Sequence, residues 1–163
     1  MTRATNESDK EGGGGGGPPT NIGELFDMAM KRGAKGTEYI FYGEVSDDEA
    51  RRIQDATGID ARGAVHIINE QEIRHAMNEH GGRGEERKGQ LPITRTDIEN
   101  IREYVRTADK VRLEGKTKVG QDLIRYQKRI NGHIVVVEEF RKGKRVLAFK
   151  TMWKYKAWKS KAD

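Results

Sequence analysis

The chain has 163 residues, of which 31 are Lys or Arg and 26 are Asp or Glu, for a formal net charge of +5. That length accommodates one modest domain with a tail, not two full domains. The absence of cysteine excludes a disulfide scaffold, a thiol nucleophile and metal sites built on thiolates. The longest aliphatic run, Ile134 to Val137, is too short to span a bilayer or to serve a signal peptide, so we expect a soluble protein with no membrane partner.

The charge is unevenly distributed along the chain. Residues 1–60 hold 7 Lys and Arg against 12 Asp and Glu, whereas residues 110–163 hold 16 against 5. A basic field of this kind favours a polyanionic partner such as nucleic acid, because each Lys or Arg that meets a phosphate releases condensed counterions. A solvated basic surface without any partner is the alternative.

The N-terminal region is predicted to contain a linker and one helix. Residues 1–20 are polar and end in six glycines and two prolines, a composition that cannot bury enough apolar surface to offset its chain entropy, so a disordered linker is expected. Residues 21–38 are predicted to form a helix and a connector. Apolar side chains at helical spacing mark that helix over Ile22–Arg32, and Gly33 ends it.

The next segment shows strand and capping signals. Thr37–Tyr42 is predicted as a short strand, and residues 65–68 as a strand or an entry loop. Ser46 followed by Glu49 is a capping box, which starts a helix that runs to Gly58.

Two further helices follow. Asn69 with Glu72 caps a helix over Glu70–His80, and the Gly-, Arg- and Glu-rich segment 81–90 after it is expected to be mobile. A third helix begins near Thr94 and is predicted to bury three apolar side chains, those of Ile98, Ile101 and Val105.

From Lys110 onward the apolar residues alternate, which is typical of strands. Strands are predicted over Leu123–Ile130 and His133–Phe140, joined by Asn131-Gly132, a strong signal for a two-residue hairpin turn. Lys142-Gly143 then turns the chain into a strand over Val146–Met152. Helices followed by an antiparallel meander give an α+β fold, in which the helices cover one face of the sheet.

Two of the four histidines, His75 and His80, lie on the predicted helix 70–80 and are candidates for proton transfer, because their ordinary pKa lies near neutrality. A structural role is the alternative: His80 would interact with the helix dipole, and His75 would pair with Glu72 or Glu79. The spacing of His and carboxylate residues predicts no metal site.

The C-terminal strands carry the strongest indication of a binding surface. Arg125 and Gln127 share one face of their strand, and a two-residue turn would pair Arg125 with Glu138. The last strand contributes Lys150 and Thr151 and leads into a segment that alternates basic and aromatic residues from Trp153 and Lys154 onward. Such a surface offers stacking and phosphate contacts together, which suits single-stranded RNA. An ordinary cross-strand ion pair and a Trp at the edge of the core are the alternative.

Several segments, in this order, resemble the phage-encoded nucleases of the barnase–EndoU–colicin–RelE class. They are Tyr39–Ser46, Ala56–Asp60, Ile73–Gly81, Ile93–Thr94 with Asp97–Ile98, Asp109–Val111, Ile124–Tyr126, Ile130–Gly132 and Lys150–Met152. The resemblance implies a nuclease domain over residues 39–156, followed by a basic tail over 157–163. It also implies helices followed by a four-stranded antiparallel meander.

The resemblance further implies a metal-independent, toxin-like endoribonuclease that needs no cofactor. Its motifs make candidates of Arg74, His75, His80, Arg125, Tyr126, Lys150 and Thr151. The candidate catalytic groups are then His75, His80, Arg125, Lys150 and Thr151. The candidate substrate contacts are Arg74 and Tyr126 from the motifs, together with Lys128, Trp153 and Lys154 from the basic C-terminal strands. Attack by the ribose 2′-OH would leave a 2′,3′-cyclic phosphate. We expect His75 to be the base or the acid, with His80 as its partner or orienter. Arg125 and Lys150 would hold the phosphate, and Thr151 or Tyr126 would donate a hydrogen bond to it.

Partners and location are expectations from the same resemblance. RNA, including tRNA, would be the substrate, an acidic inhibitor would cover the basic sheet, and the N-terminal linker would join a larger phage protein. The protein would act in the cytoplasm of the target or host bacterial cell and would be virion-associated before delivery. A non-catalytic nucleic-acid-binding module and a structural phage-particle module are the alternatives.

Overall fold

Side-chain caps fix the starts of the N-terminal helices, as the sequence predicts. In the computed structural model, which describes residues 17–31, 36–82 and 90–156, Ser46 and Glu49 form the capping box, and Asn69 accepts a hydrogen bond from the Glu72 amide. The described helices are α2 (Ile22–Met30), α3 (Asp47–Thr57), α4 (Glu70–His80), α6 (Arg95–Glu99) and α7 (Ile101–Arg106). Residues 1–16 of the predicted linker, most of the segment 81–90 and the tail 157–163 lie outside the described residues.

The helix predicted from Thr94 is two short helices. Thr94 and Asp97 form a capping box at the start of α6, and Asn100, with φ −91° and ψ 12°, separates α6 from α7. The predicted buried side chains of Ile98, Ile101 and Val105 are confirmed in the core. No helix in the described residues is long and apolar enough to cross a membrane.

The described strands form one sheet of seven, in the order β1-β2-β7-β6-β5-β4, with β3 paired to β7 as well. They are β1 (Tyr39–Glu44), β2 (Val65–Asn69), β3 (Gln90–Leu91), β4 (Lys110–Lys116), β5 (Asp122–Arg129), β6 (His133–Arg141) and β7 (Val146–Tyr155). The α+β class is confirmed, but the sheet has seven described strands where four were predicted. Strands β4 to β7 form the predicted antiparallel meander, and the parallel pairing of β2 with β7 joins β1 and β2 to it.

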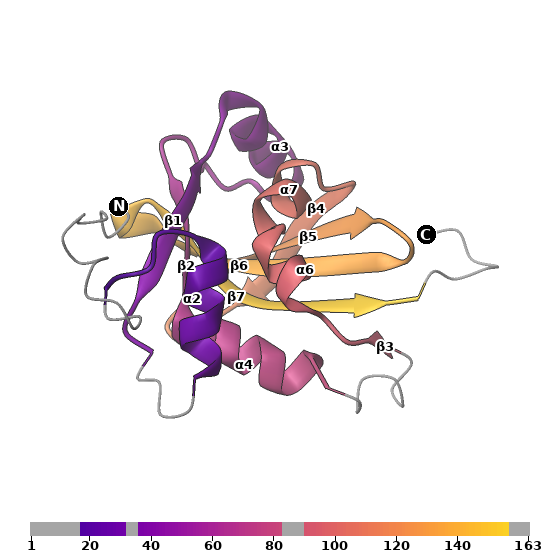
Figure 1. Cartoon of the computed structure of the whole chain (residues 1–163). Coiled ribbons are helices and arrows are strands. Elements are labelled where there is room, and N and C mark those ends of the chain that lie inside the picture. Colours follow the sequence, from indigo (N-terminus) through magenta and orange to yellow (C-terminus); the bar gives the residue numbers. More distant parts are fainter. Residues whose placement is uncertain (1–16, 32–35, 83–89, 157–163) are drawn as a thin grey trace.

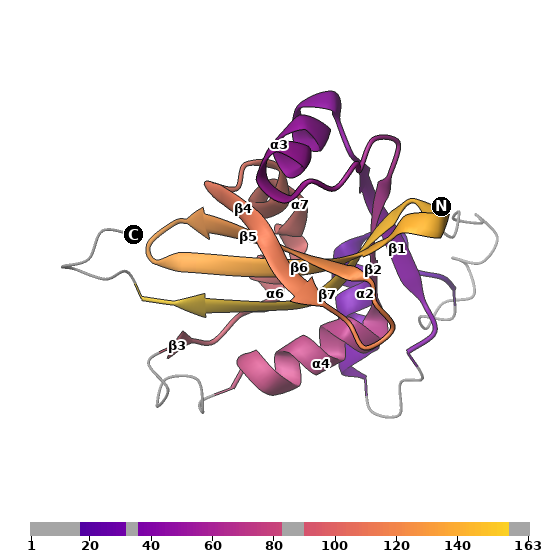
Figure 2. The same cartoon turned by 180° about the vertical axis from the view of Figure 1, so that it is seen from behind.

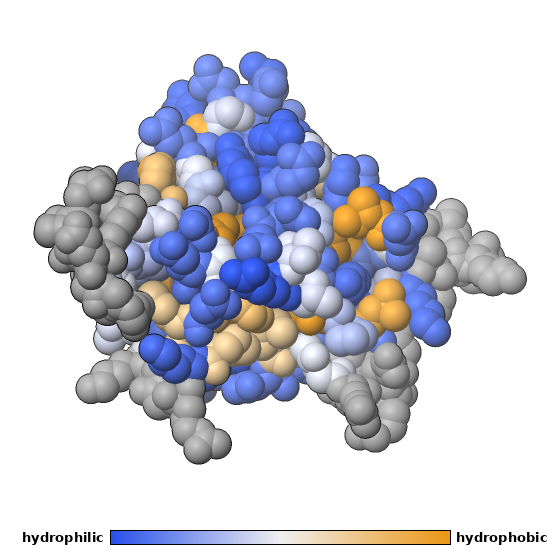
Figure 3. Space-filling model, in the orientation of Figure 1, coloured by the Kyte–Doolittle hydropathy of each residue, from blue (hydrophilic) through white to orange (hydrophobic). Residues whose placement is uncertain are grey.

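The helices lie mainly on one side of the sheet. Helices α2, α6 and α7 stand in front of the strands in Figure 1, whereas strands β5 to β7 have no helix in front of them in the reverse view of Figure 2. We call these the helix-covered face and the open face, where open means free of helices. Strand β4 passes in front of this face in Figure 2, and the residues of β6 from His133 to Phe140 are all buried. Helix α4 runs beside β7 and packs against it (Figure 1). On the helix-covered side, apolar residues form small separate patches among hydrophilic ones (Figure 3).

The β5–β6 hairpin differs from its predicted register by one residue. Arg129 pairs with His133, so the connection has three residues, and Arg125 lies opposite Val137. The predicted pairing of Arg125 with Glu138 is therefore wrong. Asn131 and Gly132 do adopt positive φ angles, +47° and +124°, as their turn signal implies. A shift of one residue moves every side chain of a strand to the other face, and it places Glu138 on the helix-covered face.

Strand β7 contains a bulge where it passes Glu138. Val137 pairs with Thr151 and Glu138 with Phe149, so that Lys150 is the additional residue. The flanking side chains of Phe149 and Met152 are both buried in the core, while Lys150 and Thr151 are both partly exposed. The bulge thus directs two consecutive polar side chains to the open face.

Candidate active site

Three side chains from separate elements meet on the open face. Trp153 of β7 lies between His80 of α4 and Arg125 of β5. The His80 and Trp153 ring centroids are 5.9 Å apart, and the Arg125 Cζ atom lies 5.4 Å from the centroid of the Trp153 ring. The cation–π contact holds the Arg125 guanidinium against the indole. A histidine and an arginine that the sequence singled out are therefore neighbours of one tryptophan.

The path of α4 explains this meeting. Asn69 ends β2, which pairs in parallel with the start of β7, and it caps α4, so α4 begins beside β7 and follows it. Near the start of α4, Glu72 Oε2 lies 3.6 Å from Lys150 Nζ. Two turns later, at the end of the helix, His80 reaches Trp153. The helix therefore borders the strand segment that displays Lys150 and Thr151.

Arg125, Val137 and Thr151 form a row across three adjacent strands. Arg125 Nε and Thr151 Oγ1 are both buried, and neither has a hydrogen-bond partner among the described residues. Within the part of the chain that the structure describes, the guanidinium has one ion pair, a long one of 3.5 Å from NH1 to Glu114 Oε1. A buried donor without a partner costs free energy, and an oxyanion would satisfy both groups. The row therefore has the chemistry of a phosphate site.

Arg112 strengthens the positive field at this row. It lies directly opposite Arg125 across the β4–β5 ladder, so two like charges are cross-strand neighbours. Such a pair is destabilising by itself. An anion bound between or beside the two guanidinium groups would relieve the repulsion.

The structure leaves Arg74 and His75 outside this cluster. His75 is 65% exposed, and its Nε2 atom lies 3.9 Å from Glu79 Oε2 on the same helix. Arg74 donates from Nε to the carbonyl oxygen of Ala29, 3.1 Å away, and so ties α4 to α2. Of the three candidates on α4, only His80 meets the strand residues.

The structure also places three predicted substrate contacts on the helix-covered face. Tyr126 is buried in the core, Lys128 Nζ donates to the Thr107 carbonyl oxygen at 3.1 Å, and Lys154 Nζ lies 2.8 Å from Asp97 Oδ2. Residues at even positions of β5 point away from Arg125 because side chains alternate along a strand. These three side chains share no surface with the cluster.

A second row of polar and aromatic side chains borders the cluster on the open face. Gln127 Nε2 lies 3.3 Å from His133 Nδ1, and the His133 ring stacks on Tyr155 with centroids 4.9 Å apart and an interplanar angle of 17°. Sequence reasoning included Tyr155 in the basic-aromatic segment but did not single out His133. Side chains alternate along β7, so Tyr155 lies on the same face as Trp153. This alternation is the sequence signal that predicts its place.

The largest departure from the sequence analysis is a buried ionic network on the helix-covered face. His66 Nδ1 lies 2.8 Å from Glu138 Oε2, and the Tyr42 hydroxyl donates to the same oxygen. His66 Nε2 lies 3.7 Å from Glu49 Oε2, and Arg102 NH1 donates to that oxygen at 2.6 Å. Both His66 and Glu138 are fully buried.

The charges of this network support one another. Burial alone would lower the pKa of His66, but the Glu138 and Glu49 carboxylates outweigh it and raise that pKa to about 9. Burial would raise the pKa of Glu49, but the adjacent His66 and hydrogen bonds from Arg102 and the Ser46 amide hold it far below its usual range. Burial and the adjacent Glu138 raise the pKa of both Tyr42 and Tyr126. The two carboxylates thus favour the imidazolium form of His66.

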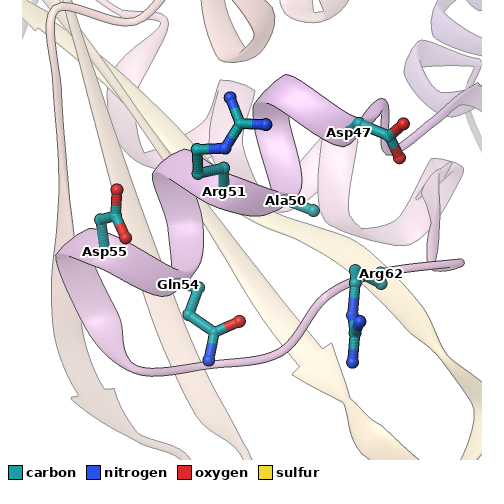
Figure 4. Close-up of a pocket in the computed structure, with 6 residues that line it drawn as sticks. All are labelled: Asp47, Ala50, Arg51, Gln54, Asp55 and Arg62. Carbon is teal, nitrogen blue, oxygen red and sulfur yellow. The ribbon is translucent and has the colours of Figure 1, made fainter.

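One surface pocket lies on α3, away from all the predicted site residues. In Figure 4, Arg51 and Asp55 point to one side of the helix and Gln54 and Arg62 to the other. Arg51 is paired with Asp48, and Arg62 with Asp60. These side chains do not converge on a common point, so the pocket offers no set of groups for chemistry.

A basic α+β domain that gathers an imidazole, a guanidinium and unsatisfied donors on one open sheet face has the construction of a phosphodiester-binding enzyme. A comparison with protein families identifies the family to which this chain belongs. The chain belongs to the family described as phage-Barnase-EndoU-ColicinE5/D-RelE like nuclease3, which matches residues 43–162. The predicted resemblance is confirmed, and the domain is one of a nuclease family. No curated protein and no solved structure matches the chain.

Proposed function

We propose that this protein is an endoribonuclease that cleaves RNA, tRNA included, by attack of a ribose 2′-OH on the adjacent phosphorus without a metal ion. The observation that carries the proposal is the convergence of His80, Trp153 and Arg125 beside the Arg125–Val137–Thr151 row. In the described residues, no three His, Asp or Glu side chains gather as ligands for a metal ion.

Arg125 and Thr151 would hold the scissile phosphate. The buried Nε of Arg125 and the hydroxyl of Thr151 would donate to its non-bridging oxygens, which gain negative charge as the 2′-oxygen attacks. The Trp153 ring, over which the Arg125 Cζ atom lies, supports the guanidinium. Stabilisation of that charge by fixed donors would supply a large part of the rate enhancement.

His80 and Lys150 would transfer the two protons. His80 would accept the proton of the 2′-OH as the 2′-oxygen–phosphorus bond forms. The Lys150 ammonium would give a proton to the 5′-oxygen as the phosphorus–5′-oxygen bond breaks. The side chain of His80 is 21% exposed and can meet a substrate, whereas His133 on the same face is 1% exposed. The products are a 2′,3′-cyclic phosphate and a free 5′-OH.

The decisive experiment incubates the full chain with tRNA and total RNA in excess EDTA and analyses the ends of the fragments. We expect cyclic-phosphate ends, a loss of about a hundredfold or more in His80→Ala, and a change of less than about threefold in His75→Ala. Unchanged cleavage by His80→Ala would remove the assigned base. Loss of all activity in EDTA would overturn the metal-free reaction, and salt-sensitive RNA binding without product would identify a binding module instead.

A further inference from the structure

The buried ionic network lies directly behind the bulge that displays the proposed phosphate ligands. Glu138 is the β6 residue at which the β6–β7 register shifts, and its ladder partner, Phe149, precedes the additional residue Lys150. The Glu138 carboxylate projects from the helix-covered face, while its neighbour Val137 occupies the row with Thr151 on the open face. One backbone segment therefore joins the network to the site.

Glu138 connects three strands at this point. Tyr42 of β1 and His66 of β2 both bond its Oε2 atom, and their rings stack with centroids 5.1 Å apart. Glu49 of α3 faces the other nitrogen of His66, and Arg102 of α7 bonds Glu49 through two nitrogens, at 2.6 and 3.2 Å. The position of β6 at the bulge is thereby fixed against two strands and two helices.

Stability alone does not account for such a network. Removing two charges from water costs several kcal/mol per ion, and well-packed apolar side chains often replace a buried ion pair without loss. The best-attested benefit of buried polar groups is that they select one register or arrangement. Register matters here, because a one-residue slip of β7 would turn the Lys150 or Thr151 side chain into the core.

We propose that the Glu138–His66–Tyr42 network is a positioning device for the phosphate site, which holds β6 at the bulge so that Lys150 and Thr151 both face the RNA. This inference rests on the proposed ribonuclease function. Glu138, His66 and Tyr42 are positioning residues, since none of them touches the open face. Their effect reaches the substrate through the backbone of β6 and the adjacent bulge of β7.

The test compares Glu138→Gln with Tyr104→Phe, a control that removes a buried hydroxyl bonded to Asp97 at 3.1 Å and does not touch Glu138. The substrate carries a single phosphorothioate at the cleaved linkage, and the rates of its two diastereomers are measured. Their ratio reports contacts to the non-bridging oxygens and does not depend on the fraction of folded enzyme. We expect the ratio of the two rates in Glu138→Gln to lie at least about fivefold closer to one than in the wild type. The reason is that a misplacement of about 1 Å can cost a hundredfold in rate. Tyr104→Phe should leave the ratio unchanged.

A second readout does not require activity. The backbone amide resonances of Lys150 and Thr151 should shift in Glu138→Gln and stay in place in Tyr104→Phe. If Glu138→Gln does not fold, Tyr42→Phe removes one of the two bonds to the carboxylate and should move both readouts in the same direction by a smaller amount. If the amide resonances of Lys150 and Thr151 do not shift and the ratio of the diastereomer rates is unchanged, the network has only a structural role. If the wild-type protein has no nuclease activity but the two amides still shift in Glu138→Gln, the proposed function is refuted. The control of the bulge by Glu138 is then still established.

Discussion

At the scale of single residues, Arg125 combines more roles than any other side chain on the open face. Its guanidinium stacks on Trp153, its Nε is buried without a partner among the described residues, and Arg112 faces it across the ladder. A lysine would keep the charge but would lose the planar stacking and the Nε donor. This distinction separates a shaped phosphate site from a surface that is merely basic.

Replacing Arg125 by Lys should therefore lower kcat/KM for RNA cleavage by about tenfold to a hundredfold, because charge-assisted, directed hydrogen bonds to the phosphate are lost. Steady-state cleavage of a fluorescent oligoribonucleotide measures the effect. Arg106→Lys is the matched control, since Arg106 lies on the surface of α7 and pairs with Glu103. Equal activities of Arg125→Lys and the wild type would show that only the positive charge matters.

The sequence predicted some residues of the site more readily than others. His80, Arg125 and Trp153 came from local signals: a helix-terminal histidine, strand alternation and a basic-aromatic segment. His66 was missed because it stands in a short segment that was predicted as either a strand or a loop. Its partner Glu138 was assigned to the wrong face by the one-residue error in the hairpin. A buried histidine between carboxylates depends on contacts 72 residues apart, which no local pattern contains.

At the scale of elements, β1 and α7 meet through a close approach at Gly43. A Cβ atom on this residue would lie 2.5 Å from Arg102 Nε, so a side chain there would displace the guanidinium. Arg102 is the cation that holds Glu49, and Glu49 in turn faces His66. Because Gly43 has no side chain, Arg102 can lie against β1 and bond Glu49 at the outer edge of the network.

Gly43→Ala should destabilise the protein by about 1–3 kcal/mol, because Glu49 would lose its hydrogen-bonded cation in a buried position. Urea unfolding followed by circular dichroism measures the change. Gly143→Ala serves as the control, since a Cβ there would meet nothing within 4 Å, and it should stay within about 0.5 kcal/mol of the wild type. A Gly43→Ala protein as stable as the control would mean that Arg102 moves aside freely.

The elements themselves were largely predictable, and their arrangement was not. Capping residues marked the starts of α3 and α4, and alternation marked β5 and β6. The Asn131-Gly132 signal gave the turn but not its length, because Ile130 also belongs to the connection. The parallel pairing of β2 with β7 joins segments about 80 residues apart. It depends on tertiary packing, and it is the contact that brings α4 beside the strands of the candidate site.

At the scale of the whole molecule, the buried network joins the two parts of the sheet. β1 and β2 precede α4, whereas β4 to β7 form the C-terminal meander. Among the described strands, the short parallel β2–β7 ladder is the one that connects the two groups. The bonds of Glu138 to Tyr42 and His66 add a second connection, through side chains in the core. The charge state of His66 should therefore be visible in the stability of the entire fold.

The raised pKa of His66 sets the direction of that dependence. Its folded value of about 9 exceeds the ordinary value of 6.5, so the folded state binds a proton that the unfolded state releases. The resulting stabilisation is fully present below pH 6.5 and is lost as the pH rises through 9. The free energy of unfolding should fall across this window by up to about 3 kcal/mol, as 1.36 kcal/mol per pKa unit implies. The double variant His66→Gln/Glu138→Gln lacks both the imidazole and the buried carboxylate that would take up a proton in its absence. Its urea titrations at pH 6, 7, 8 and 9 should give a lower but nearly flat stability. The same decline in both proteins would show that other groups cause the pH dependence and that His66 is neutral between Glu49 and Glu138.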